Sequence, residues 1–148
     1  RVRIEPPPEK LMDVGDLGEA LVRSHGHQMQ ERMGVVLVDA RHRVMKQKEI
    51  FIGSLKETLV STRDIIRYAL LEHAAGIVVF HNHPSGDPTP SNDDITFTQQ
   101  LAHSMMLVDV EFVDHLIIAA HRYCSMKQAG LVQPATRTGL GAVTSRSA

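Results

Sequence analysis

An apolar run that ends abruptly in two histidines and a proline-rich loop constrains the fold of this chain more than any other feature. The run is Ile77-Val78-Val79-Phe80, and His81-Asn82-His83-Pro84 follows it directly. An uninterrupted apolar run bounded by polar residues predicts a buried central strand. Residues two apart on a strand point to the same side, so His81 and His83 would present two imidazoles together where the strand leaves the sheet.

The loop after the histidines can return the chain toward them. Three prolines and one glycine at positions 84–90 exclude a helix there, and helical spacing begins after Ser91. Ser91 and Asp94 form Ser-x-x-Asp, which is close to the capping box that starts many helices. Two interpretations stay open from spacing alone, namely a metal site of His81, His83 and Asp94, or a polar loop followed by a capped helix.

The spacing His-x-His, seven residues, Ser, two residues, Asp resembles the motif of the JAMM metalloenzymes of the JAB/MPN family, on His81, His83, Ser91 and Asp94. The string from His81 to Ser91, and Asp114-His115-Leu116-Ile117-Ile118 downstream, resemble the RadC-type branch. The resemblance covers about residues 34–131. It implies a cytidine-deaminase-like three-layer fold, a zinc ion on His81, His83 and Asp94, and hydrolysis of peptide or isopeptide bonds.

The resemblance also implies a glutamate upstream that activates water as a general base. In RadC-type chains a glutamate stands shortly before Phe-x-Gly, as Glu49 stands before Phe51-Ile52-Gly53. Glu57, in a polar stretch, is the alternative. We expect Glu49, because a strand holds a general base more firmly than a loop. The Ser91 hydroxyl would donate to the oxyanion that develops during hydrolysis.

The other apolar patterns predict an α/β fold with a mixed β-sheet flanked by helices on both faces, in three layers. The expected elements are a helix within 9–33 that breaks near Gly26, a hairpin of strands 34–39 and 44–52, helices from Ser61 and from Ser91, strands 108–112 and 116–119, and a short strand with a helical turn at 123–132.

Four further histidine and aspartate residues lie outside this motif. Asp114 and His115 lie between two predicted strands, where they could support the metal-binding histidines or form a turn. His25 and His27 repeat the His-x-His spacing without a following carboxylate, and we expect a solvated helix end there.

The length of 148 residues predicts one domain at 9–132, preceded by an extended, proline-containing lead at 1–8 and followed by a mobile tail at 133–148. Cys124 is the single cysteine, which excludes a disulfide framework, a four-cysteine zinc ribbon and a deaminase-type zinc site. No apolar stretch approaches the ~20 residues of a membrane span. We therefore expect a cytoplasmic protein, and the resemblance implies that it acts on a protein or peptide substrate.

Two other functions fit parts of the sequence. The RadC-type resemblance brings a historical DNA-repair label, but the net charge of −1 gives no general attraction for nucleic acid, so any such association would be weak. The residues before Gly34 are also too few and not basic enough for the helix-hairpin-helix segment of many RadC-type proteins. A metal-free scaffold is the third possibility, and the presence of every expected ligand weakens it.

Overall fold

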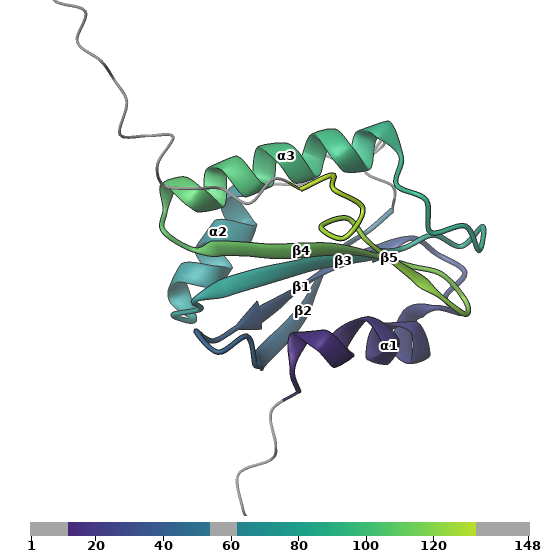
Figure 1. Ribbon diagram of the computed structural model, residues 1–148, viewed down its shortest axis with the longest axis horizontal. Coiled ribbons are helices and arrows are strands. Elements are labelled where there is room, and N and C mark those ends of the chain that lie inside the picture. Colours follow the sequence, from purple (N-terminus) through teal and green to yellow (C-terminus); the bar gives the residue numbers. More distant parts are fainter. Residues whose placement is uncertain (1–11, 54–61, 133–148) are drawn as a thin grey trace, which may run out of the picture.

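A computed structural model describes residues 12–53 and 62–132 of the chain (Figure 1). The predicted lead at 1–8, the predicted tail at 133–148 and the alternative base Glu57 lie outside the described residues. Those three predictions therefore stay predictions.

The described residues form a mixed five-stranded sheet in the order β2-β1-β3-β4-β5. The strands are β1 (Arg32–Val38), β2 (Val44–Ile52), β3 (Gly76–Asn82), β4 (Glu111–Ile118) and β5 (Tyr123–Ser125). The pairs are antiparallel except β3 with β4, which are parallel. All seven residues of β3 are buried, which confirms the prediction of a buried central strand.

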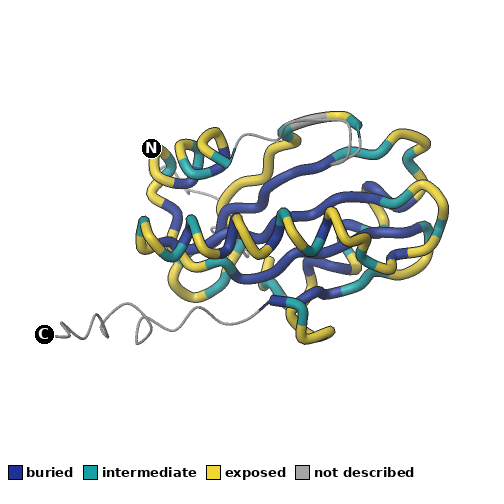
Figure 2. Tube along the Cα trace, turned by 90° about the horizontal axis from the view of Figure 1, so that it is seen from above, coloured by how far each residue is buried: buried dark blue, intermediate teal, exposed yellow. Residues whose placement is uncertain are grey.

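Helices cover both faces of this sheet, so the fold has the three layers that were predicted (Figure 1). The helices are α1 (Val14–His25), α2 (Thr62–Leu71) and α3 (Asn92–Leu107). Helix α1 lies on one face, and α2 and α3 lie on the other. The buried backbone follows the strands between these helices (Figure 2). Every described helix is too short or too polar to cross a lipid bilayer.

The alternation of side chains along β3 decides which face each site residue reaches. Ile77 and Val79 pack in the core beneath α2 and α3, whereas Val78 and Phe80 pack in the core beneath α1. Continuing this alternation, His81 faces the α3 side of the sheet and Asn82 faces the α1 side.

A β-bulge in β4 is the clearest difference from the predicted elements. Ile77 lies opposite Phe112 and Val78 opposite Asp114, so Val113 is the extra residue in β4. The sequence predicted two strands separated by Asp114 and His115, and this was wrong, because β4 continues through both polar residues. The bulge shifts the alternation by one, which turns His115 toward α3 and Asp114 toward α1.

The first helix is shorter than the 9–33 segment in which it was expected. Helix α1 ends at His25, Gly26 follows as its C-cap, and β1 begins at Arg32. The prediction of a break near Gly26 is confirmed. The expectation of a solvated helix end was wrong for His25, which is buried, although His27 is exposed.

Candidate metal centre

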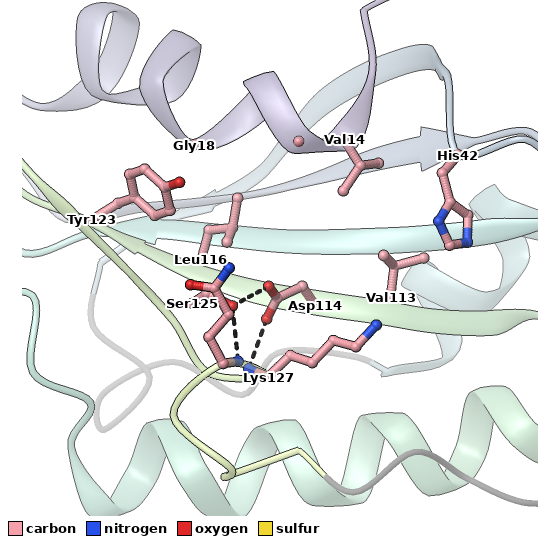
Figure 3. A pocket seen from close by; sticks show the side chains of 11 residues that line it. Val14, Gly18, His42, Val113, Asp114, Leu116, Tyr123, Ser125 and Lys127 are labelled. Carbon is pink, nitrogen blue, oxygen red and sulfur yellow. Dashed lines mark hydrogen bonds between the residues drawn. The ribbon is translucent and has the colours of Figure 1, made fainter.

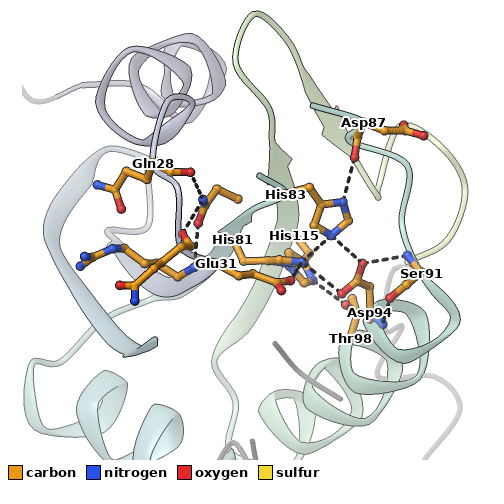
Figure 4. A network of polar contacts seen from close by, with 12 residues as sticks. Gln28, Glu31, His81, His83, Asp87, Ser91, Asp94, Thr98 and His115 are labelled. Carbon is orange, nitrogen blue, oxygen red and sulfur yellow. Dashed lines mark hydrogen bonds and ion pairs between the residues drawn. The ribbon is translucent and has the colours of Figure 1, made fainter. Parts of the chain in front are cut away.

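The end of β3 and the start of α3 bring the three expected metal ligands together. His81 is the second-to-last residue of β3, His83 directly follows β3, and Asp94 lies in the first turn of α3 (Figure 4). The Nε2 atoms of the two histidines are 2.9 Å apart. His81 Nε2 is 3.1 Å from Asp94 Oδ1, and His83 Nε2 is 3.2 Å from Asp94 Oδ2.

These separations suit a metal ion held by all three side chains. Zinc binds imidazole nitrogen and carboxylate oxygen at about 2.0–2.2 Å, so tetrahedral ligand atoms lie roughly 3.3 Å from one another. The distances of 2.9, 3.1 and 3.2 Å between the three side chains are close to that value. The donor set of two imidazoles and a carboxylate therefore fits a transition-metal ion.

Asp94 also caps α3, so the two interpretations of this residue hold together. The Ser91 amide donates to Asp94 Oδ2 at 2.8 Å, and the Asp94 amide donates to Ser91 Oγ at 3.1 Å. This reciprocal pair is the capping box predicted from the sequence. Because Ser91 Oγ accepts from Asp94, its own O–H remains able to donate elsewhere. Ser91 itself is exposed.

The contact between Asp94 and His83 shifts the pKa of each residue. Burial alone would raise the pKa of Asp94, but hydrogen bonds from His81 and His83 outweigh it and lower that pKa below its ordinary value. Burial alone would lower the pKa of His83, but its hydrogen bond to Asp94 raises that pKa. Asp94 is therefore held as the carboxylate, which is the form that binds a metal.

The loop fixes the ring orientation of His83. Its Nδ1 lies 2.9 Å from the backbone carbonyl oxygen of Asp87. A carbonyl oxygen only accepts, so His83 Nδ1–H donates to it. In a neutral His83 ring that binds a metal, the proton therefore stays on Nδ1 and the Nε2 lone pair is left for the ion, which is the usual arrangement of a metal-binding histidine.

Glu31 is a second carboxylate at this site, and it was not among the residues predicted from the sequence. Its Oε1 lies 3.6 Å from His81 Nε2, and the donor atoms of Glu31, His81 and His83 lie within 4.8 Å of one another (Figure 4). Glu31 directly precedes β1, two residues before Met33, which pairs with His81. The signal available in the sequence was a carboxylate at the start of the apolar run 33–38.

Glu49, the expected base, lies on the α1 side of the sheet. Its Oε1 is 3.3 Å from His25 Nε2 at the end of α1, and its Oε2 is 3.0 Å from an Arg32 guanidinium nitrogen. His81 faces α3 instead. The structure thus places Glu31 beside the histidine pair and gives Glu49 other partners.

Asn82, between the two histidines, holds the segment that contains Glu31. Its side chain is 1% exposed on the opposite face of β3 from His81. Its Oδ1 accepts from the Arg32 amide at 2.7 Å, and its Nδ2 donates to the carbonyl oxygens of Gln30 at 2.9 Å and Gln28 at 3.3 Å. These bonds bracket Glu31 on both sides, so Asn82 fixes the backbone from which Glu31 extends.

Asp114 and His115 are neighbours in β4 with different surroundings, and neither belongs to a turn. His115 Nε2 lies 2.8 Å from His81 Nδ1, so this histidine contacts one of the candidate ligands. Asp114 accepts hydrogen bonds from the Ser125 hydroxyl and from the amides of His115 and Lys127. Burial nevertheless raises the pKa of Asp114 above its ordinary value.

Asp114 also lines a cavity of about 450 Å³ between α1 and the β4–β5 end of the sheet (Figure 3). The cavity lies on the α1 face, and its lining residues are Val14, Gly15, Gly18, His42, Val113, Asp114, Leu116, Tyr123, Ser125, Lys127 and Gln128. The histidines and carboxylates of the metal centre are not among them.

Comparison with known proteins shows the family of this chain. Residues 11–131 match the RadC-like JAB domain family. A UPF0758 protein of Methanosarcina acetivorans is 34% identical over 130 residues, which are 88% of this chain and 57% of that protein. A UPF0758 protein of Chloroflexus aurantiacus is 40% identical over 116 residues, which are 78% of this chain and 51% of that protein. The chain thus spans about half the length of the curated relatives it matches, and it belongs to the RadC-like JAB domain family.

Proposed function

We propose that this chain is a zinc-dependent hydrolase of peptide or isopeptide bonds, in which His81, His83 and Asp94 hold the metal and Glu31 is the general base. The observation that supports the proposal most directly is the convergence of the two Nε2 atoms and the Asp94 carboxylate, with separations of 2.9–3.2 Å. Three protein ligands leave a fourth position open, as in catalytic zinc sites.

The two carboxylates take different roles because their surroundings differ. Asp94 contacts both Nε2 atoms and its side chain is 3% exposed, whereas the Glu31 side chain is 25% exposed and lies 3.6 Å from His81 Nε2. A ligand needs close, fixed contacts with the other ligands. A general base needs access to water and the reacting amide, which favours Glu31.

The chemistry divides between the metal and the side chains around it. When bound, zinc lowers the pKa of a coordinated water to about 7 and polarises a carbonyl group. Glu31 accepts the proton of the attacking water and passes it to the leaving amine. The Ser91 hydroxyl donates to the developing oxyanion, and removing such a donor typically costs about 10²- to 10³-fold in rate.

Glu31 replaces Glu49 as our choice of base on the strength of the contacts. Glu49 is engaged by His25 and Arg32 on the α1 face, and these contacts hold its carboxylate away from His81. The pair also supplies a matched control, because both residues are glutamates of the same hairpin, Glu31 directly before β1 and Glu49 within β2.

The metal content of purified protein is the first test. We expect about one zinc per chain after dialysis, and we expect His81→Ala to lose it, because two remaining ligands hold the ion poorly. Full zinc content in His81→Ala would refute the ligand assignment.

The second test measures hydrolysis of fluorogenic peptides and isopeptide-linked substrates. Glu31→Gln should keep zinc and lose at least about 10²-fold in rate, since general acid–base catalysis contributes about 10²–10⁴-fold. Glu49→Gln should keep both its zinc and its rate of hydrolysis. The reverse result, with activity lost only in Glu49→Gln, would return the base to Glu49.

A further inference from the structure

We infer that His115 and Thr98 are positioning residues that hold the proton of His81 on Nδ1 and so keep its Nε2 lone pair for the metal. This inference rests on the proposed metal centre and adds two residues to it. Thr98 lies in the second turn of α3, and His115 lies in β4.

His81 needs such residues because its surroundings differ from those of His83. The Nδ1 of His83 faces a backbone carbonyl, which fixes the proton by itself. The Nδ1 of His81 faces His115 Nε2 at 2.8 Å, and a ring nitrogen can either donate or accept. The proton position on His81 is therefore decided by what lies beyond His115.

The contacts of Thr98 give the network its direction. Thr98 Oγ1 lies 2.6 Å from the backbone carbonyl oxygen of Asp94, which can only accept, so the single hydroxyl proton of Thr98 goes there. The sulfur of Met126, 3.6 Å from Thr98 Oγ1, is a weaker acceptor. Having donated its proton, Thr98 Oγ1 accepts from His115 Nδ1 at 2.6 Å.

The burial of His115 completes the sequence of donors and acceptors. His115 is 0% exposed, and its two ring nitrogens contact Thr98 Oγ1 and His81 Nδ1, so no carboxylate among these partners would stabilise a charged ring. A neutral imidazole has one N–H, which the contact with Thr98 places on Nδ1. His115 Nε2 is then an acceptor, and His81 Nδ1 must donate to it. If His115 Nε2 donated to His81 instead, His115 Nδ1 would have to accept the Thr98 hydroxyl proton. Thr98 would then lose its hydrogen bond to the Asp94 carbonyl.

The network also ties the histidine to the helix that supplies a metal ligand. Thr98 donates to the main-chain carbonyl of Asp94, whose side chain contacts His81. One set of short contacts thus sets the proton on His81 and the position of Asp94. Residues that orient metal ligands in this way commonly change metal affinity by about 10- to 100-fold when removed.

The affinity test compares two substitutions at Thr98. Thr98→Val keeps the shape of the side chain and removes the hydroxyl, whereas Thr98→Ser keeps the hydroxyl. With zinc affinity measured by competition with a chromophoric chelator, we expect Thr98→Val to bind about 10- to 100-fold more weakly than the parent. Thr98→Ser should stay within about threefold of the parent, although it loses a buried methyl group. Equal affinities of the two variants would overturn the inference.

A second pair tests His115 itself. His115→Gln keeps an oxygen that can accept from His81 Nδ1, and His115→Leu does not. We expect His115→Gln to restore most of the zinc affinity that His115→Leu loses. Equal losses in both would show that only packing matters at this position.

Nitrogen-15 NMR of labelled histidines in the parent gives a readout that needs no variant and no activity. We expect His115 to bear its proton on Nδ1 in both the metal-free and the zinc-loaded protein, and His81 to bear a proton on Nδ1 with zinc bound to Nε2. A proton on His115 Nε2 in either state would overturn the inference. Zinc bound with these tautomers, but without hydrolysis of any substrate, would refute the proposed function and leave the inference standing.

Discussion

Met33 of β1 lies directly opposite His81 of β3, and this pairing decides which glutamate lies beside His81 and His83. Glu31 stands two residues before Met33, so the alternation of the strand brings it to the face that His81 occupies. Glu49 lies opposite Gly34, whose neighbours on that face belong to the core under α1. A shift of one residue in this register would exchange the faces of the two carboxylates.

The double role of Asp94 can be separated by substitution. Asp94→Asn keeps an oxygen for the Ser91 amide and loses the charge, so we expect it to lose zinc at concentrations the parent retains. Asp94→Ala should lose zinc and also about 1 kcal/mol of metal-free stability, because the cap is lost. Zinc titration and urea unfolding measure the two effects.

Ser91→Ala is the control for Asp94. It removes the hydroxyl half of the capping box, so it should cost about 1 kcal/mol in stability and leave zinc affinity unchanged. A loss of zinc equal to that in Asp94→Asn would show that the cap, and not the carboxylate charge, governs metal binding.

Asn82→Ala should destabilise the protein by about 3 kcal/mol, because it removes three hydrogen bonds worth about 1 kcal/mol each from a buried position. Chemical denaturation with and without a chelator measures this loss. Asn92→Ala, at an exposed position at the start of α3, is the control and should change stability by less than about 0.5 kcal/mol. Similar losses of stability in both variants would argue against the role of Asn82 in holding the backbone at Glu31.

The His83–Asp94 contact should contribute most to the unfolding free energy of the metal-free protein between about pH 4 and about pH 6.5. The pKa of Asp94 is lowered on folding, so its contribution is present above about pH 4 and is lost as the pH falls. The pKa of His83 is raised, so its contribution is complete below about pH 6.5 and is lost as the pH rises through the folded-state value. The difference in unfolding free energy between the parent and His83→Gln, measured after chelation, should therefore peak in this window; a difference independent of pH would contradict it.

Gly34→Ala should destabilise the core under α1 by about 1–3 kcal/mol. A Cβ atom at this position would collide with the fully buried ring of Phe80 and approach the Lys48 carbonyl oxygen to 3.0 Å. Thermal unfolding of Gly34→Ala, Phe80→Leu and the double variant tests the cause. If the ring is the obstacle, the double variant will lose less stability than the sum of the two single changes. Additive losses would show that the Phe80 ring is not the cause of the destabilisation in Gly34→Ala.

The sequence was most informative where structure is local. The apolar run before His81 and the Ser-x-x-Asp after the loop predicted the central strand, the capped helix and the grouping of His81, His83 and Asp94, because one strand–loop–helix unit contains them all. The face of each glutamate depended on the pairing of distant strands. The bulge at Val113 likewise turns His115 toward α3, and the sequence of β4 contains no signal that distinguishes such a bulge from a break.

The grouping of the three proposed ligands within residues 81–94 has a consequence for how the protein acquires its metal. A chain still emerging from the ribosome has the complete ligand set before β4 and His115 have been synthesised, so we expect chelation to begin on an unfolded segment. Binding to the unfolded chain subtracts from the stabilisation that a native-state ligand provides. Zinc should therefore raise the melting temperature by less than its affinity for the folded protein alone would give. The difference measures how tightly zinc binds the unfolded chain.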